Sequence, residues 1–302
     1  MMAGILVLAC LPGCVAAPVA PSTPPADVCD PVTPRTEFTL RVAAGELGST
    51  IDVVTRRVSE LGYAAHIGGL DKNDMWVVFC QAMNADEVDS VTQLVSASGL
   101  FGVRQVYQAS ASAGQGQSSP AAPTKWPSPR GTSQEASVDD LMSWQPTTKL
   151  MDAFSSWDCG GKAAGGQPVS DAWNQPLFAC DNTGQKYLLG PVIVDGPHVA
   201  ASVALVPSGQ TDLELSIALD GEGQTRFAQA TAVLAGQSSP KNRLALLVDG
   251  QVLTAPEVRD PIDGGTLQLT GLAPDDAKTL AAVLQTAATP IHVTDVSVNQ
   301  VP

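Results

Sequence analysis

The sequence has few basic residues and no long apolar segment. Its 302 residues include 16 Lys and Arg against 30 Asp and Glu, which gives a formal net charge of -14. Binding to nucleic acid or to anionic lipid headgroups requires clustered cations, so this balance argues against both kinds of partner. The longest apolar run, at residues 3–11, is about half of the roughly 20 residues that a membrane-spanning helix needs.

Enzyme and metal-site motifs are also missing. There is no G-x-S-x-G or H-E-x-x-H, and GGKAAGG at residues 160–166 lacks the upstream Gly and the following Ser or Thr of a phosphate-binding loop. His66, His198 and His292 are far apart in the sequence, and the Asp-Gly pairs lack the spacing of a calcium loop. We therefore expect no catalytic residue, metal ion or cofactor, and a hydrolase is the least favoured function.

The apolar run at residues 3–11 suits the central region of an export signal. It leads into Leu11-Pro12-Gly13-Cys14, which resembles a bacterial lipobox, the motif whose cysteine receives a lipid. Cys10 is a poorer candidate because too little apolar sequence precedes it. Pro12 is unusual in such a motif, and no Lys or Arg precedes the run. We expect a signal at 1–14 with lipidation at Cys14 and a Pro-rich tether at 15–36; the alternatives are a cleaved secretory signal and a buried apolar segment.

Four cysteines remain beyond the signal, and none has C-x-x-C spacing. They are Cys29, Cys80, Cys159 and Cys180. An even number in an exported chain favours disulfides over metal binding. Of the three pairings, the one that joins Cys159 to Cys180 is the most economical because that bond closes a Gly-rich loop. Free buried thiols are the alternative.

Residues 37–108 predict a small α+β domain. Phe38, Leu40 and Val42 alternate as in a half-buried strand, and a helix is expected after Ser49 and Thr50, with a capping box at Asp52. A buried strand at 75–80, a helix capped by Asn84 and Glu87, and a strand at 103–107 follow. The order strand, helix, strand, helix, strand favours a ferredoxin-like domain.

The middle of the chain is poor in apolar residues. Residues 109–149 predict a disordered linker, and residues 150–186 a loop-rich segment held by Cys159 and Cys180.

The last third, residues 187–298, again predicts an α/β domain. Alternating apolar residues at 213–219 predict a strand, and Asp220 caps the helix that follows. A strand at 243–248 turns back at Asp249 and Gly250, a pair that suits a type I′ hairpin. A strand at 266–270 precedes a helix that begins with Pro274, and residues 291–298 are extended.

Four blocks of this region resemble a known family. They are YLLGPVIVDGPHVAAS at 187–202, LDGEGQTRFAQAT at 219–231, RLALLVDGQVLTAPEVRDPIDGG at 243–265 and LTGLAPDDAKTLAAVLQTAATPIHV at 269–293. In order and spacing they resemble the head subdomain of the first periplasmic domain of SecD, a protein-translocation subunit. Residues 37–108 are more faintly similar to the base subdomain. The resemblance implies contact with translocating polypeptide and with the Sec machinery, made by a head that moves relative to its base.

The sequence also departs from that family. The membrane spans and the proton-coupling acidic residue of SecD have no counterpart here, so the resemblance does not extend to the motor chemistry. Binding of unfolded chain requires an apolar groove or an open sheet edge. We take five residues after the hairpin as candidates for it, with a role in covering the sheet as the alternative. They are Leu253, Thr254, Ala255, Pro256 and Val258.

These observations predict a non-enzymatic lipoprotein at the extracytoplasmic face of the cell membrane. It would bind exported or unfolded polypeptide in connection with translocation. The alternative is a structural lipoprotein that reuses the fold to scaffold envelope components, because a fold does not determine a function.

Overall fold

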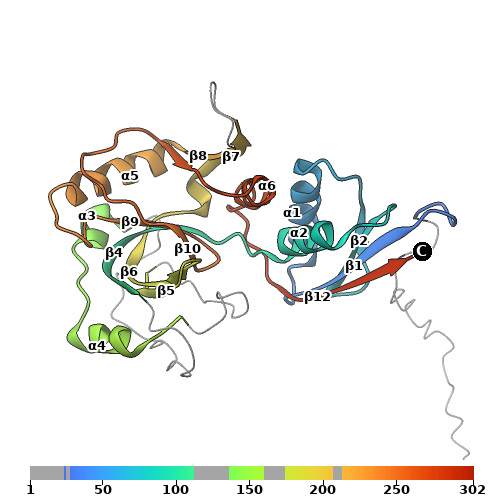
Figure 1. Cartoon of the computed structure of the whole chain (residues 1–302), viewed down its shortest axis with the longest axis horizontal. Helices are drawn as coiled ribbons and strands as arrows, with labels where there is room; N and C mark the ends of the chain where they lie inside the picture. Colours follow the sequence, from blue (N-terminus) through green and yellow to red (C-terminus); the bar gives the residue numbers. More distant parts are fainter. Residues whose placement is uncertain (1–23, 25–27, 112–135, 160–173, 207–212) are drawn as a thin grey trace, which may run out of the picture.

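The computed structural model describes residues 24, 28–111, 136–159, 174–206 and 213–302, and these residues form two lobes (Figure 1). The base lobe contains six elements. They are β1 (Arg35–Val42), α1 (Leu47–Glu60), β2 (His66–Gly69), β3 (Asp74–Phe79), α2 (Ala85–Ser96) and β12 (Val293–Val301). The head lobe contains the other elements, which lie between α2 and β12 in the sequence.

The base lobe is a four-stranded antiparallel sheet in the order β12-β1-β3-β2. The chain order βαββαβ and this strand order are those of a ferredoxin-like domain. The expected alternation is present in β1, where Phe38, Leu40 and Val42 are buried. The predicted capping box of α2 is confirmed, because the Asn84 side chain accepts from the Glu87 N–H while the Glu87 side chain accepts from the Asn84 N–H.

The helix α1 begins earlier than predicted. It starts at Leu47 after Glu46, no side chain caps its N-terminus, and Thr50 is buried within its first turn. The expected capping box at Asp52 is therefore wrong. The polar pair Ser49 and Thr50 indicated a start, but the Ser49 hydroxyl instead donates to the carbonyl of Glu46, one turn earlier.

A closed five-stranded barrel forms one half of the head lobe, with strand order β10-β5-β6-β4-β9. Its strands are β4 (Phe101–Ala111), β5 (Leu177–Asp181), β6 (Gln185–Asp195), β9 (Leu244–Val248) and β10 (Gln251–Thr254). Small and aliphatic side chains fill its interior, among them Val106, Leu189 and Leu247. The β9–β10 hairpin turns at Asp249 and Gly250 with φ of 50° and 77°, so the predicted turn with positive φ at both residues is confirmed.

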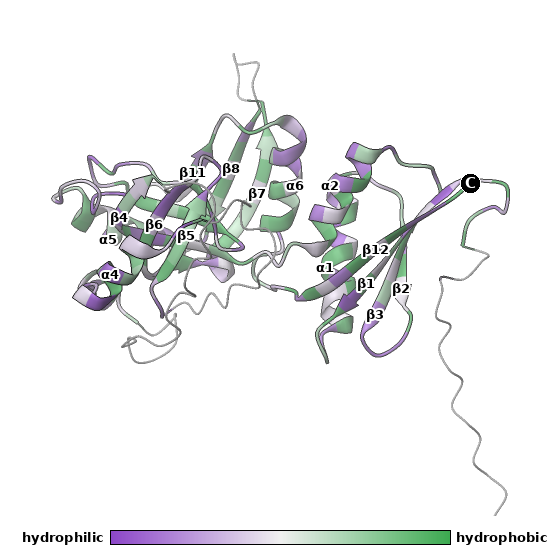
Figure 2. Cartoon of the chain, turned by 60° about the horizontal axis from the view of Figure 1, so that its bottom comes forward, coloured by the Kyte–Doolittle hydropathy of each residue, from purple (hydrophilic) through white to green (hydrophobic). Residues whose placement is uncertain are grey.

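A three-stranded sheet and two helices form the other half. The sheet has the order β11-β8-β7, and its strands are β7 (Val199–Leu205), β8 (Glu214–Leu219) and β11 (Thr266–Leu269); a 3-10 turn, Gly196–His198, precedes β7. Figure 2 shows β7 and β8 coloured mainly as hydrophobic. The helix α5 (Gly221–Leu234) is capped by Asp220 as predicted, and α6 (Pro274–Leu284) begins with Pro274. Since α6 packs against β7 and β8 as well as against α1 and α2, it joins the two lobes.

The α+β class predicted from the sequence is confirmed, but two strands change lobe. Residues 103–107, expected to complete the base domain, lie in β4 and pair with β6 and β9 in the barrel. Residues 293–298, expected in the head domain, lie in β12 and pair with β1. The head is thus inserted into the base between α2 and β12 (Figure 1). Both lobe assignments were wrong because they depend on pairing between distant segments. The alternation of a strand shows which face is buried but not which strand it pairs with.

The expected linker is partly ordered. Residues 112–135 lie outside the described residues, whereas 109–111 extend β4 and 138–142 form α3 (Val138–Met142). The signal was Ser137, whose hydroxyl accepts from the Asp140 N–H as an N-cap, ahead of three buried apolar side chains: Val138, Leu141 and Met142. Of the expected loop-rich segment, 148–156 form α4 (Thr148–Ser156), 177–181 form β5 and 185–186 begin β6.

The N-terminal expectations lie largely outside the structure. The signal at 1–14, with Cys14, falls outside the described residues, as does most of the tether at 15–36. The described end of the tether is not free, because Cys29 is buried and disulfide-bonded to Cys80, and because Arg35 and Thr36 already belong to β1.

Candidate functional site

The five residues predicted to bind polypeptide are paired within the head lobe. Leu253 and Thr254 belong to β10. The Ala255 carbonyl accepts from Arg243 Nε at 2.6 Å, and the Pro256 carbonyl accepts from the Leu244 N–H at 3.2 Å. The Val258 N–H donates to the Asn242 carbonyl at 2.7 Å, and Ala255 and Val258 are buried. We expected this Pro-containing segment to be hard to pair, and that premise is wrong. Pro256 has no N–H to donate, but the carbonyls of Ala255 and Pro256 both accept hydrogen bonds. A binding role for it stays a prediction.

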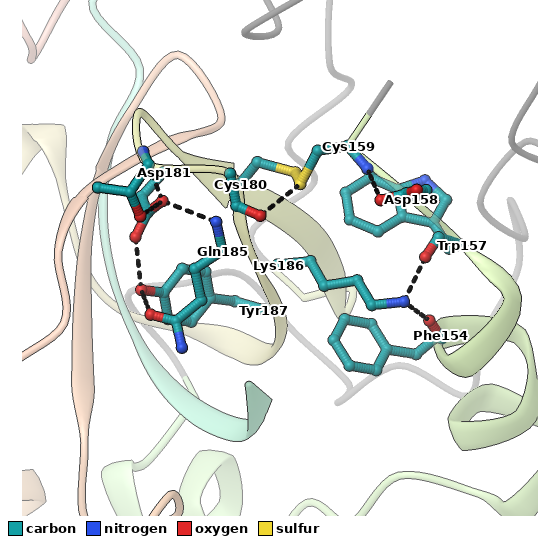
Figure 3. The surroundings of a disulfide bond; sticks show 11 residues. Phe154, Trp157, Asp158, Cys159, Cys180, Asp181, Gln185, Lys186 and Tyr187 are labelled. Carbon is teal, nitrogen blue, oxygen red and sulfur yellow. Dashed lines mark hydrogen bonds between the residues drawn. A yellow bond between two sulfur atoms is a disulfide. The ribbon is translucent and has the colours of Figure 1, made fainter. Parts of the chain in front are cut away.

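The predicted disulfide between Cys159 and Cys180 is confirmed (Figure 3). It ties the residues after α4 to the end of β5. The second bond, between Cys29 and Cys80, ties the start of the described base to the end of β3. Together they are the pairing that the sequence favoured.

Lys186 is a buried cation that sequence analysis missed. Its ammonium donates to the carbonyls of Phe154 at 3.0 Å, of Ser155 at 3.2 Å and of Trp157. These carbonyls end α4, where a cation is favoured by the helix dipole. The ammonium also lies 5.0 Å from the centre of the Phe154 ring (Figure 3). The only signal in the sequence was a Lys within an otherwise apolar strand pattern.

Aromatic rings hold α4 against the outside of the barrel. Phe154 packs edge-on to Phe178 with ring centres 5.4 Å apart, and Trp157 lies 5.5 Å from Phe178. Tyr107 of β4 packs against Trp144 at 4.7 Å, and its hydroxyl donates to the Trp144 carbonyl. Burial raises the pKa of Tyr107, so this hydroxyl stays a donor across the usual pH range.

A groove lies between α4 and the end of β4. It encloses about 530 Å³. Its lining residues come from β4, α4, β6 and the loop before β9, and they are Tyr107, Gln108, Ala109, Ser110, Phe154, Ser155, Lys186 and Pro240. No Asp or Glu is among them. In a chain with 30 acidic residues, this groove is lined by no carboxylate.

The junction of the lobes contains a second buried cation. Arg57 of α1 donates to Thr286 Oγ1 at 2.8 Å and to the carbonyls of Leu94 and Ala97. Burial lowers the pKa of Arg57 to about 10, although Asp249 nearby opposes this. The two segments that connect the lobes, one after α2 and one before β12, also meet here. The Ile291 N–H of the second donates to the Ser98 carbonyl of the first at 3.1 Å. This junction therefore connects base helices, both connecting segments and the end of α6.

The three histidines do not come together. His198 is buried and lies 3.2 Å from Asp220 Oδ1, whereas His292 lies 3.0 Å from Glu46, and His66 is exposed in β2. Among the described residues, no group of three or more His, Cys, Asp or Glu side chains is placed to hold a metal ion.

Comparison with known proteins finds a match for part of the head lobe. Residues 174–291 match the family described as the P1 head subdomain of SecDF. SecD of Streptomyces coelicolor, a protein translocase subunit, is 31% identical over 163 residues, which covers 51% of this chain and 28% of that protein. SecD of Acidaminococcus fermentans is 35% identical over 110 residues, or 36% of this chain and 25% of that protein.

The chain contains a SecD-like periplasmic domain. The resemblance seen in the four blocks is thus confirmed. The crystal structure of SecDF in its super-membrane-facing form is 18% identical, covering 87% of this chain and 30% of that one, with a TM-score of 0.49. A second SecDF structure, from work on a membrane component that enhances protein export, is 19% identical over 86% of this chain and 98% of that one, with a TM-score of 0.47.

The SecD-like match does not cover every element of the groove. The match to the P1 head subdomain begins at residue 174, and so it includes Lys186 and Pro240 but none of the lining residues of β4 and α4. Residues 37–108 also lie outside it, and the fainter resemblance of that region stays a prediction. In the part of the chain that the structure describes, no helix has the length and apolar character needed to cross a membrane.

Proposed function

We propose that this chain binds exported or unfolded polypeptide, without catalysing a reaction, in connection with protein translocation. The observation that carries the proposal is the SecD-like domain at residues 174–291, whose relatives are named protein translocase subunits. The chain covers 28% of the length of the Streptomyces relative, so contact with the Sec machinery is part of this proposal. The affinity should be weak, because ordering a disordered client offsets about 2 to 5 kcal/mol of the contact energy.

Titration with one client protein in two states tests this function. The chain is titrated with a reduced, unfolded protein and, as the matched control, with the same protein oxidised and folded. We expect backbone chemical shifts of the head lobe to change only with the unfolded form and to persist in moderate salt, because contacts through the main chain and apolar groups are not screened. Equal responses to both forms, or none at millimolar client, would favour the scaffold alternative.

We further propose that the protein is held at the extracytoplasmic face of the membrane by a lipid on Cys14. The lipobox-like sequence Leu11-Pro12-Gly13-Cys14 supports it. Replacing Cys14 with Ser should release the protein into the soluble fraction, whereas Cys10→Ser, the matched control, should leave it with the membranes. Retention of the Cys14→Ser protein on carbonate-washed membranes would contradict the lipid anchor.

A further inference from the structure

One edge of β4 is unpaired near its end. The pairing of β4 with β9 stops at Gln105 and Leu244, whereas its pairing with β6 continues to Ala111 and Gln185. A single bond from the Val106 N–H to the Arg243 carbonyl follows the end of the β9 ladder. Residues 108–111 therefore pair with β6 on one side and with no described strand on the other. Such an edge presents main-chain donors and acceptors to an incoming chain.

The groove reaches this unpaired edge. Tyr107 to Ser110 form one wall. The second wall, Phe154 and Ser155 of α4 with Lys186 of β6, lies on the side of β4 where β6 pairs, and Pro240 lies on the open side. The second wall is held in place by the disulfide at Cys159 and by the three carbonyls that Lys186 binds. Four residues of extended chain span about 13 Å at roughly 3.3 Å per residue, which is the length of the unpaired edge.

The charge of the groove differs from that of the whole molecule. Lys186 lines it, and the ammonium of Lys241 lies 5.7 Å from the centre of the Tyr107 ring at its side. No carboxylate lines it, while the chain carries a formal charge of -14. Two ammonium groups without an acidic neighbour in the lining attract negative side chains and repel positive ones.

We propose that this groove takes one extended polypeptide segment, which adds as a strand to the free edge of β4 opposite β6. The charge of the groove favours segments with acidic or uncharged side chains over segments with Lys or Arg. Main-chain hydrogen bonds supply the affinity in this mode of recognition, and the rings of Tyr107 and Phe154 offer apolar contact. The inference rests on the proposed function and gives it a site. The wall residues 107–110 and 154–155 precede the match to the P1 head subdomain, which begins at residue 174.

Filling the groove tests its location. Ser155→Trp places a large side chain in the groove, while Ser156→Trp is the matched control on the same helix end, since both serines are exposed and only Ser155 lines the groove. The probe is a capped seven-residue peptide of alternating Val and Thr with a central Glu. We expect Ser155→Trp to weaken its binding at least about tenfold and Ser156→Trp to change it less than about twofold. In the unmodified chain, those amides of residues 108–111 that point away from β6 should gain protection from hydrogen exchange on binding.

The charge preference has its own measurement. The same peptide with a central Lys should bind the unmodified chain about threefold more weakly at low salt, and this difference should shrink as salt rises. Equal binding of the two peptides at low salt would overturn the preference.

The outcomes separate the site from the function. If the chain binds unfolded protein and Ser155→Trp binds it as well as Ser156→Trp does, the site is wrong and the proposed function stands. If the chain binds no unfolded protein, the function itself fails. Full protection of the amides of 108–111 in the free chain would mean that its own residues occupy the edge, and a dimer that Ser155→Trp abolishes would mean that a second copy does. Either result overturns the proposal.

Discussion

At the scale of single residues, Asp249 has two roles. Its backbone adopts φ of 50°, which Asp and Asn tolerate better than most residues, in the turn between β9 and β10. Its side chain accepts from the Leu100 N–H at 2.9 Å, and its own N–H donates to the Leu100 carbonyl at 2.9 Å. The turn could be predicted from the pair Asp249 and Gly250. The contact with Leu100 could not, because it joins residues 149 positions apart.

Burial of the Asp249 carboxyl makes the free energy of unfolding depend on pH. Desolvation raises the pKa of Asp249 above its ordinary 3.8, although the Leu100 N–H and Arg57 act in the opposite direction. A carboxyl with a raised pKa in the folded state binds its proton more tightly there than in the unfolded state. This residue's contribution to the free energy of unfolding therefore falls as pH rises from about 3.8 through the folded-state pKa, and the penalty persists at higher pH.

Asp249→Asn should remove this penalty. Asn keeps the oxygen that accepts from Leu100, tolerates positive φ and carries no charge to desolvate. Urea unfolding of both proteins between pH 3.5 and 7, a range chosen around that window, should show the variant equal at the acidic end and more stable at neutral pH. If the stabilities of the two proteins differ by the same amount at every pH, the assignment is contradicted. It is also contradicted if the variant loses stability relative to the unmodified protein as pH rises.

At the scale of elements, α4 depends on tertiary bonds. It has nine residues, which is too short for a helix to be stable alone in water. The Thr147 hydroxyl accepts from the Leu150 N–H at its start, and Lys186 binds the carbonyls at its end. The disulfide between Cys159 and Cys180 holds the chain next to it on β5.

Removing that disulfide should destabilise the head. The double variant Cys159→Ser with Cys180→Ser opens a loop with a sequence separation of 21, and the chain-entropy account gives a loss of about 3 kcal/mol. The matched variant Cys29→Ser with Cys80→Ser opens a separation of 51, for which we expect about 4 kcal/mol. Urea unfolding measures both losses.

The location of each loss is the sharper measurement. Hydrogen exchange should accelerate in α4 and β5 for the first double variant and around β3 for the second. Unchanged exchange in α4 without its disulfide would show that Lys186 and the aromatic packing suffice to hold the helix.

At the scale of the whole molecule, the base lobe is closed by the last strand of the chain. All eight residues of β1 pair with β12, although more than 250 positions separate the two strands. A chain that ends at residue 292 should therefore lose protection from hydrogen exchange in β1 by at least about tenfold, because β1 becomes an edge strand. The barrel strands β4 and β6 should keep theirs, since they pair with each other.

The matched control for this truncation is removal of Pro302 alone, which follows β12. It should leave exchange in β1 unchanged. If β1 keeps its protection without β12, the base sheet does not need its fourth strand and the inserted arrangement of the head has no energetic consequence.

The sequence by itself determined the elements whose signals are local. Alternation predicted β1 and β8, polar caps predicted α2 and α5, and the pair Asp249 and Gly250 predicted a hairpin, because each signal is complete within a few neighbouring residues. The sequence also favoured the bond between Cys159 and Cys180, because it closes a Gly-rich loop. Only the tertiary structure decided that residues 103–107 join the barrel and that residues 293–298 join the base. It alone also showed that Lys186 binds the carbonyls at the end of α4 and that the groove lies beside β4. These features depend on which distant segments pair and pack, and strand patterns carry no record of the partner.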